Sequence, residues 1–187
     1  MEILYSQGTL KIYGKTFVDG EKVTGWLPLG NRWYYIANDD YMVTGYYKVG
    51  NSTYYFDESG LMQTGWFKIN GEDYYATSSG AIQAQWVKSL SNWYYVDVDG
   101  KMVTGYQTIN GAKYYFASSG LMQKGWFKIN GEDYYAASSG TIQAQWVKSG
   151  RNWYYVDTDG KMVTGDYIID RKVNYFDNQG LWMNKMN

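Results

Sequence analysis

The feature that most constrains the fold is a repeat of 20 residues that runs through nearly the whole chain. Glycine recurs at positions 60, 80, 100, 120, 140, 160 and 180, and Tyr-Tyr pairs recur at the same interval from 34/35 to 154/155. A unit this short cannot bury a hydrophobic core alone, so successive units must stack on one another. We therefore expect eight tandem repeats over residues 25–184, a degenerate N-terminal repeat over residues 1–24 and a short tail at residues 185–187.

A second, longer period divides these units into three types, because every third unit is alike. Type A units carry two tryptophans, type B units open with Gly-Tyr or Gly-Asp, and type C units read GWFKINGEDYY. The type C segment 65–84 reappears at 125–144 with 18 of 20 positions identical. Type A comprises residues 25–44, 85–104 and 145–164; type B comprises 45–64, 105–124 and 165–184. The longer period suggests the hypothesis of three hairpins per superhelical turn, and duplication of a three-unit gene segment is the alternative that leaves the same trace.

Each unit is predicted to be a β-hairpin followed by a connector. In type C units, Asn70-Gly71 and Asn130-Gly131 separate short runs of aromatic and β-branched residues. Asn-Gly is the strongest signal for a two-residue type I′ turn, because both turn positions need a positive φ. Since a lone hairpin is only marginally stable in water, the predicted fold is an all-β solenoid of stacked hairpins.

Composition excludes several classes of function. The chain has no cysteine and no histidine, so it cannot form a disulfide, a Cys/His metal site or a Ser-His-Asp triad, and no resident cofactor is expected. Its net charge of −1 argues against non-specific nucleic-acid binding. We find no signal peptide and no apolar run of transmembrane length, and thus expect no membrane span. The carboxylate pair Asp97 and Asp99 lies beside Gly100, where aspartate favours a turn, so we expect no enzymatic activity.

The tryptophans of type A units are spaced to build an aromatic pocket. The register of the Asn-Gly turn, transferred to the first type A unit, places Trp26 and Trp33 on one face of the hairpin, because strand residues alternate faces. Tyr54 of the next hairpin is expected to add a third wall, and Met42 a polarisable floor. Such a cage suits a quaternary ammonium, and the same ring faces also stack on sugars, so the residues leave both ligands open.

The pattern Gly-Trp, about six residues, Trp-Tyr-Tyr and then Gly-x-Met resembles the cell-wall-binding repeat family, specifically the choline-binding modules of pneumococcal-type surface proteins, autolysins and phage lysins. It is present in QWVKSLSNWYYVDVDGKMVTG, where Gln85 replaces the first glycine, and in GWLPLGNRWYYIANDDYMVTG. The resemblance implies a left-handed solenoid with choline bound between successive repeats. The choline-binding residues that it implies are Trp26, Trp33, Met42 and Tyr54; Trp86, Trp93, Met102 and Tyr114; and Trp146, Trp153 and Met162.

Two departures from the pattern set further expectations. The third site is expected to keep only two aromatic walls and to be weak, because Asn174 stands where the tyrosine should be. Type C units have Asp73 and Asp133 in place of the second tryptophan, so their interfaces are expected to be weak, structural or selective for another ligand.

The resemblance also implies a function. It implies a non-catalytic module that anchors a larger protein, outside the cell, to choline residues of teichoic or lipoteichoic acid on a Gram-positive cell wall. A second copy of the chain, bound through the terminal repeats as a homodimer, is a further expected partner. The alternative is a glucan- or glycan-binding module of the glucosyltransferase or clostridial-toxin type, which uses similar hairpins.

Overall fold

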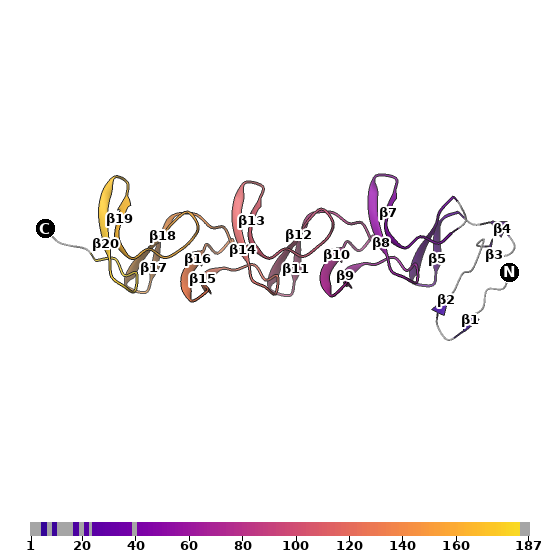
Figure 1. Ribbon diagram of the computed structural model, residues 1–187, viewed down its shortest axis with the longest axis horizontal. Coiled ribbons are helices and arrows are strands. Elements are labelled where there is room, and N and C mark those ends of the chain that lie inside the picture. The colour runs from indigo at the N-terminus through magenta and orange to yellow at the C-terminus, as the bar shows by residue number, and fades with distance from the viewer. Residues whose placement is uncertain are drawn as a thin grey trace. The chain divides into compact units, whose positions relative to one another are not determined.

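The computed structural model describes residues 24–38 and 41–183 in full (Figure 1). Nearer the N-terminus it describes four short strands, which are β1 (Tyr5–Ser6), β2 (Thr9–Leu10), β3 (Phe17–Val18) and β4 (Glu21–Lys22). The expected degenerate repeat and C-terminal tail otherwise lie outside the described residues. Within the described part of the chain, no helix has the length and apolar character needed to cross a membrane.

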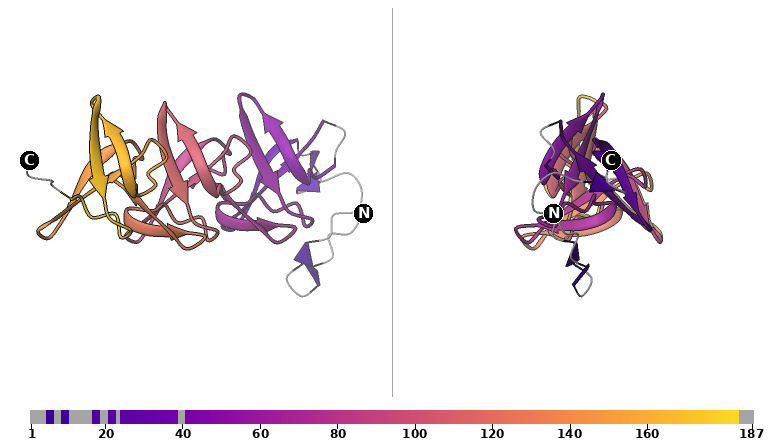
Figure 2. Two further views of the ribbon diagram at one scale, coloured as in Figure 1. Left: turned by 60° about the vertical axis from the view of Figure 1, so that its left-hand side comes forward. Right: turned by 90° about the vertical axis from the view of Figure 1, so that its right-hand side faces the viewer.

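From residue 25 onward the strands come in pairs, and each pair forms its own two-stranded sheet (Figures 1 and 2). The pairs begin at regular intervals, at positions 25, 45, 65, 85, 105, 125, 145 and 165, so the all-β array of eight hairpins predicted from the repeat is confirmed. The strands are β5 (Gly25–Leu29), β6 (Arg32–Ile36), β7 (Gly45–Val49), β8 (Ser52–Phe56), β9 (Gly65–Ile69), β10 (Glu72–Ala76), β11 (Gln85–Ser89), β12 (Asn92–Val96), β13 (Gly105–Ile109), β14 (Ala112–Phe116), β15 (Gly125–Ile129), β16 (Glu132–Ala136), β17 (Gln145–Ser149), β18 (Asn152–Val156), β19 (Gly165–Ile169) and β20 (Lys172–Phe176).

The turns and the register agree with the local chemistry of the sequence. Asn70 has a φ of 52° and Gly71 a φ of 85°, which are the two positive values that a type I′ turn requires. In the first type A hairpin, Trp26 lies opposite Tyr35 and Trp33 lies opposite Pro28. The two tryptophans therefore share one face of this hairpin, as the alternation of strand residues predicts.

Backbone hydrogen bonds from the connectors join hairpins that share no sheet. The amide of Met62 donates to the carbonyl of Trp33 (2.8 Å), and the amide of Ile82 donates to the carbonyl of Thr53 (2.8 Å). In each case one whole hairpin separates the acceptor from the donor along the chain, and the same link recurs up to the pair Trp182 and Trp153 (2.8 Å). From residue 57 onward, each described connector therefore returns to the hairpin before the one that it has just left.

The described contacts divide the chain into two units, the first comprising residues 1–87 and 95–102 and the second comprising residues 88–94 and 103–187. Each unit contains a small apolar cluster between its hairpins. In the first unit the buried residues Leu27, Tyr34 and Ile36 pack together with Leu29, Met42 and Leu61. In the second unit the buried residues Val163, Ile169 and Phe176 pack together with Tyr155, Tyr167 and Trp182.

Candidate functional site

The first unit contains a pocket of about 530 Å³ with three aromatic walls. The walls are Trp26 of β5, Trp33 of β6 and Tyr54 of β8, so two successive hairpins build it. Its volume lies in the range of small-ligand sites. The remaining lining residues are Asn31, Met62, Thr64, Ser78 and Ser79.

The rings of this pocket meet edge to face. Trp26 and Trp33 have their centroids 6.2 Å apart and their planes at 85°. Trp26 and Tyr54 lie 4.8 Å apart, with their planes at 77°. Trp26 is fixed from behind by Tyr35 (5.2 Å) and Phe56 (6.1 Å), whereas Trp33 remains exposed. The arrangement therefore combines one well-held indole with a second that is open to a ligand.

The chemistry of the pocket favours a cation without N–H groups. Among the described side chains that line it, none carries a formal charge. A trimethylammonium needs no hydrogen-bond acceptor, and it is attracted by the π faces of indole and phenol rings. A primary ammonium would instead lose its hydrogen bonds to water without gaining a carboxylate partner.

The methionine in this pocket is Met62, and not Met42 as the sequence suggested. Met62 is brought there by its amide, which donates to the carbonyl of Trp33. Met42 instead packs against the apolar cluster of the first unit and over Gly60, where an added Cβ would overlap the methionine sulfur. The connector that closes a pocket thus lies one 20-residue repeat further along the chain than the sequence suggested.

The other two predicted methionines are displaced in the same way. The amide of Met102 donates to the carbonyl of Asp73 (2.9 Å), and the amide of Met162 donates to the carbonyl of Asp133 (2.9 Å). Both methionines therefore lie with type C hairpins and not with their own type A hairpins. The methionine that lies with Trp93 is Met122, whose amide donates to the Trp93 carbonyl (2.9 Å).

The second predicted set of residues is divided between the two units. Trp86 and Met102 belong to the first unit, and Trp93 and Tyr114 belong to the second. This site therefore stays a prediction from the sequence. In the second unit, the Lys88 ammonium nitrogen lies 5.8 Å from the ring centroid of Trp93.

The third predicted set has three aromatic rings instead of the two that were expected. Trp146 and Trp153 lie 6.4 Å apart with their planes at 85°, which closely reproduces the first pair. A further indole, Trp182, lies 5.3 Å from Trp146 at 74°. The expectation of two walls rested on the loss of tyrosine at Asn174, and it did not include Trp182, which stands where the first pocket has Met62.

In type C hairpins the second tryptophan is replaced by an aspartate that is already paired. Lys68 forms a salt bridge with Asp73, and Lys128 forms one with Asp133, each at 2.7 Å. Trp126 still meets Tyr154 of the following hairpin, with a centroid distance of 5.4 Å. Since each carboxylate has its own lysine, these positions fit a structural role better than the capture of a cation.

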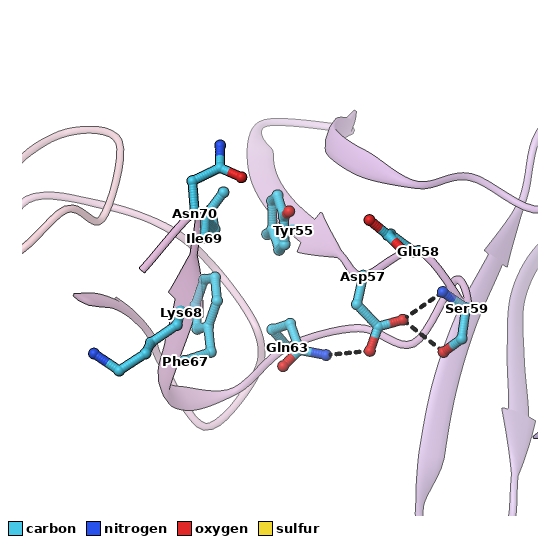
Figure 3. A pocket seen from close by; sticks show the side chains of 9 residues that line it. All are labelled: Tyr55, Asp57, Glu58, Ser59, Gln63, Phe67, Lys68, Ile69 and Asn70. Carbon is cyan, nitrogen blue, oxygen red and sulfur yellow. Dashed lines mark hydrogen bonds between the residues drawn. The ribbon is translucent and has the colours of Figure 1, made fainter. Parts of the chain in front are cut away.

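A second pocket of about 530 Å³ lies along β8, β9 and the connector between them (Figure 3). Tyr55 and Phe67 stack in it with centroids 5.3 Å apart. Its most buried carboxylate, Asp57, accepts hydrogen bonds from the Ser59 amide (2.9 Å), the Ser59 hydroxyl (2.6 Å) and the Gln63 side-chain amide (2.9 Å). Asp57 is thus occupied in shaping the connector that closes the aromatic pocket.

The fold and the pocket define a class of protein, namely a module of hairpin repeats with aromatic pockets between neighbouring hairpins. The choline-binding repeat matches residues 43–85 and 103–144, and the putative cell wall binding repeat matches residues 85–102 and 145–162. Together these matches cover residues 43–162 without a gap. The chain belongs to the family of choline-binding, cell-wall-binding repeats, which confirms the resemblance seen in its sequence.

Solved structures of pneumococcal proteins share this fold. CbpJ from Streptococcus pneumoniae is 32% identical with a TM-score of 0.75, over 87% of this chain and 59% of that chain. Choline binding protein F from S. pneumoniae is 29% identical with a TM-score of 0.75, over 87% and 58%. The S. pneumoniae autolysin LytC is 25% identical with a TM-score of 0.59, over 86% and 39%.

The chain thus spans about six-tenths of the length of CbpJ and of choline binding protein F. A search of curated protein sequences finds no match. The repeats themselves form a non-catalytic module.

Proposed function

We propose that the chain anchors a larger protein to choline residues of teichoic and lipoteichoic acids on a Gram-positive cell wall, and that it works at the cell surface. The observation that carries this proposal is the uncharged pocket of Trp26, Trp33, Tyr54 and Met62 in a chain of choline-binding repeats. Each cation–π contact contributes roughly 0.5–2 kcal/mol, so a single site binds weakly. Several sites on one chain then raise the overall affinity by roughly 10²- to 10⁴-fold.

The arrangement of the hairpins that we propose is a left-handed solenoid with three hairpins per turn, as the family resemblance implies. Contacts between residues nearly three repeat lengths apart in the sequence support the number of hairpins per turn. In the first unit of the structure, the Tyr46 hydroxyl donates to the carbonyl of Asp99 (2.9 Å), in the connector of the second repeat beyond it. In the second unit, the Tyr106 hydroxyl donates to the carbonyl of Asp159 in the same way (2.9 Å).

We further propose that the module has no catalytic activity and that any catalytic domain of the parent protein lies outside it. Dimerisation through the terminal repeat is supported by an exposed apolar pair on the last hairpin, where Ile168 lies opposite Val173. Sedimentation velocity of the wild type and of Ile168→Lys tests the dimer, which should be lost in the variant.

Titration of the tryptophan fluorescence with choline and with ethanolamine tests the choice of ligand. Choline should change the emission in the millimolar range, which corresponds to about −4 kcal/mol per site. Ethanolamine should act far more weakly, because its ammonium is more strongly hydrated and no carboxylate lines the pocket to replace that hydration. Equal responses to the two amines would overturn the aromatic-cage interpretation.

Binding to isolated cell walls distinguishes choline from a glycan as the natural ligand. The chain should bind walls whose teichoic acids carry choline, and free choline should release it. Retention on choline-free walls, or displacement by soluble glucan instead of choline, would support the glycan-binding alternative.

A further inference from the structure

Two positions differ together between the first aromatic pocket and its counterpart in the last type A unit. Tyr54 corresponds to Asn174, and Met62 corresponds to Trp182. The first exchange removes an aromatic wall, and the second introduces a larger one from the connector. The structure shows that these two new side chains bind each other, since the indole N–H of Trp182 donates to Oδ1 of Asn174 (3.2 Å).

The ring of Trp182 is held by hydrogen bonds as well as by packing. The Trp182 backbone amide donates to the carbonyl of Trp153 (2.8 Å), just as the amide of Met62 donates to Trp33. The Asn174 side chain that accepts the indole N–H is itself oriented, because its Nδ2 donates to the carbonyl of Lys172 (3.1 Å). The side chain of Trp182 therefore has a defined position beside Trp146.

The Trp182 ring meets Trp146 with a distance and an angle close to those of the tyrosine in the first pocket. Trp182 meets Trp146 at 5.3 Å and 74°, whereas Tyr54 meets Trp26 at 4.8 Å and 77°. Trp182 thus stands against Trp146 much as the tyrosine stands against Trp26. An indole that instead filled the space between Trp146 and Trp153 would bury both, yet they remain 36% and 39% exposed.

We propose that Trp182 closes a third quaternary-ammonium site together with Trp146 and Trp153, and that this site binds choline at least as tightly as the pocket around Trp33. This inference rests on the proposed choline-binding function. Its physical basis is that tryptophan gives the strongest cation–π attraction of the aromatic side chains, so an indole from the connector more than replaces a phenol from the next hairpin. Asn174 acts as a positioning residue, because it orients the indole of Trp182 and adds no π face itself.

Nuclear magnetic resonance of the indole N–H groups resolves the sites within one sample. The signals of Trp33, Trp146, Trp153 and Trp182 are assigned from single Trp→Phe variants of the full chain. Choline titrations then give a dissociation constant for the first pocket from Trp33 and one for the third site from Trp146 and Trp153. In the wild type, the two dissociation constants should be similar, or the constant of the third site should be lower than that of the first pocket.

Trp182→Ala should weaken choline binding at Trp146 and Trp153 by roughly 2- to 30-fold, the equivalent of one cation–π contact, and leave the Trp33 response unchanged. Trp182→Met should weaken it as well, and the double variant Asn174→Tyr with Trp182→Met should restore it by rebuilding the first arrangement. Met183→Ala is the matched control, because this neighbouring side chain is exposed, and it should leave both constants unchanged.

The outcomes separate this inference from the proposed function. If Trp33 does not respond to choline in the wild type, the proposed function fails. If Trp33 responds but Trp182→Ala leaves the third site unchanged or makes it tighter, the inference alone fails, because Trp182 then does not act as a wall or occludes the site. Loss of binding at Trp146 and Trp153 in Trp182→Ala, with Trp33 unaffected, supports it.

Discussion

Trp26 and Trp33 line the same pocket, but their removal should affect the protein differently. Trp33 is 44% exposed and meets Trp26 edge-on at 6.2 Å. Truncation of a fully buried tryptophan costs about 3–5 kcal/mol, partly because it leaves a cavity. Since little more than half of Trp33 is covered and it faces an open pocket, Trp33→Ala should lower the free energy of unfolding by only about 1–2 kcal/mol.

Trp26 is held much more firmly. Its ring meets those of Trp33, Tyr35, Tyr54 and Phe56 at centroid distances of 6.2, 5.2, 4.8 and 6.1 Å. Each aromatic pair contributes roughly 0.5–1.5 kcal/mol beyond the area that it buries. Trp26→Ala should therefore approach the full cost of about 3–5 kcal/mol, in addition to removing the same ligand wall.

The effects of these variants on stability and on choline binding are measured separately. Urea unfolding followed by far-ultraviolet circular dichroism gives the stability, and equilibrium dialysis gives the number of choline molecules bound per chain. Each variant should lose one choline, and only Trp26→Ala should be strongly destabilised. Trp66→Ala is the matched control, because Trp66 is 38% exposed in a type C hairpin and its loss should lower stability without changing the stoichiometry.

Two results would refute this reasoning. If Trp33→Ala retains the wild-type choline stoichiometry, Trp33 is not a ligand wall. If it destabilises the fold as much as Trp26→Ala, the exposed ring of Trp33 contributes to the fold in a way that its contacts do not explain.

The same geometry predicts three further effects. Burial raises the pKa of Tyr46 from 10.0 to about 12, so the stability contributed by its neutral hydroxyl is complete below pH 10 and is lost as the pH rises through 12. Tyr46→Phe should thus cost about 0.5–1.5 kcal/mol in urea unfolding at pH 8 and little near pH 12; a difference that does not change with pH would contradict this. Gly80→Ala should weaken choline binding at Trp33, because Gly80 has a φ of +83° and the added methyl meets the tip of Met62. In the control Gly65→Ala, the added methyl meets no atom within 4 Å, so this variant should affect stability alone. The choline affinity reported by Trp33 should not change between about pH 5 and 9, because no described lining residue carries a charge; a midpoint in that range would reveal an ionisable group in the site.

The register of the hairpins could be predicted from the sequence because it depends on local chemistry. Asn70-Gly71 sets a two-residue turn, and the alternation of strand residues then places Trp33 opposite Pro28 and on the same face as Trp26. An error of two positions would have left these faces unchanged. Trp26, Trp33 and Tyr54 therefore meet as the pattern predicted.

The fourth lining residue could not be found in this way. Whether Met42 or Met62 reaches the pocket depends on which connector bonds to which hairpin, and this is a property of the stack that no single repeat contains. The proposed role of Trp182 did leave a signal in the sequence, because the longer period places Met62 and Met122 before it and tryptophan breaks the series.

The link between each connector and an earlier hairpin also determines how a gene of this kind can change in length. Unequal recombination between the segments 65–84 and 125–144, which share 18 of 20 positions, inserts or deletes three whole units and preserves every such link. Deletion of residues 45–64 alone would instead bring Ile82 to the place where Met62 closes the first pocket. Duplication of three repeats therefore multiplies complete sets of linked hairpins, so the length of the array can change while every side chain keeps its partners.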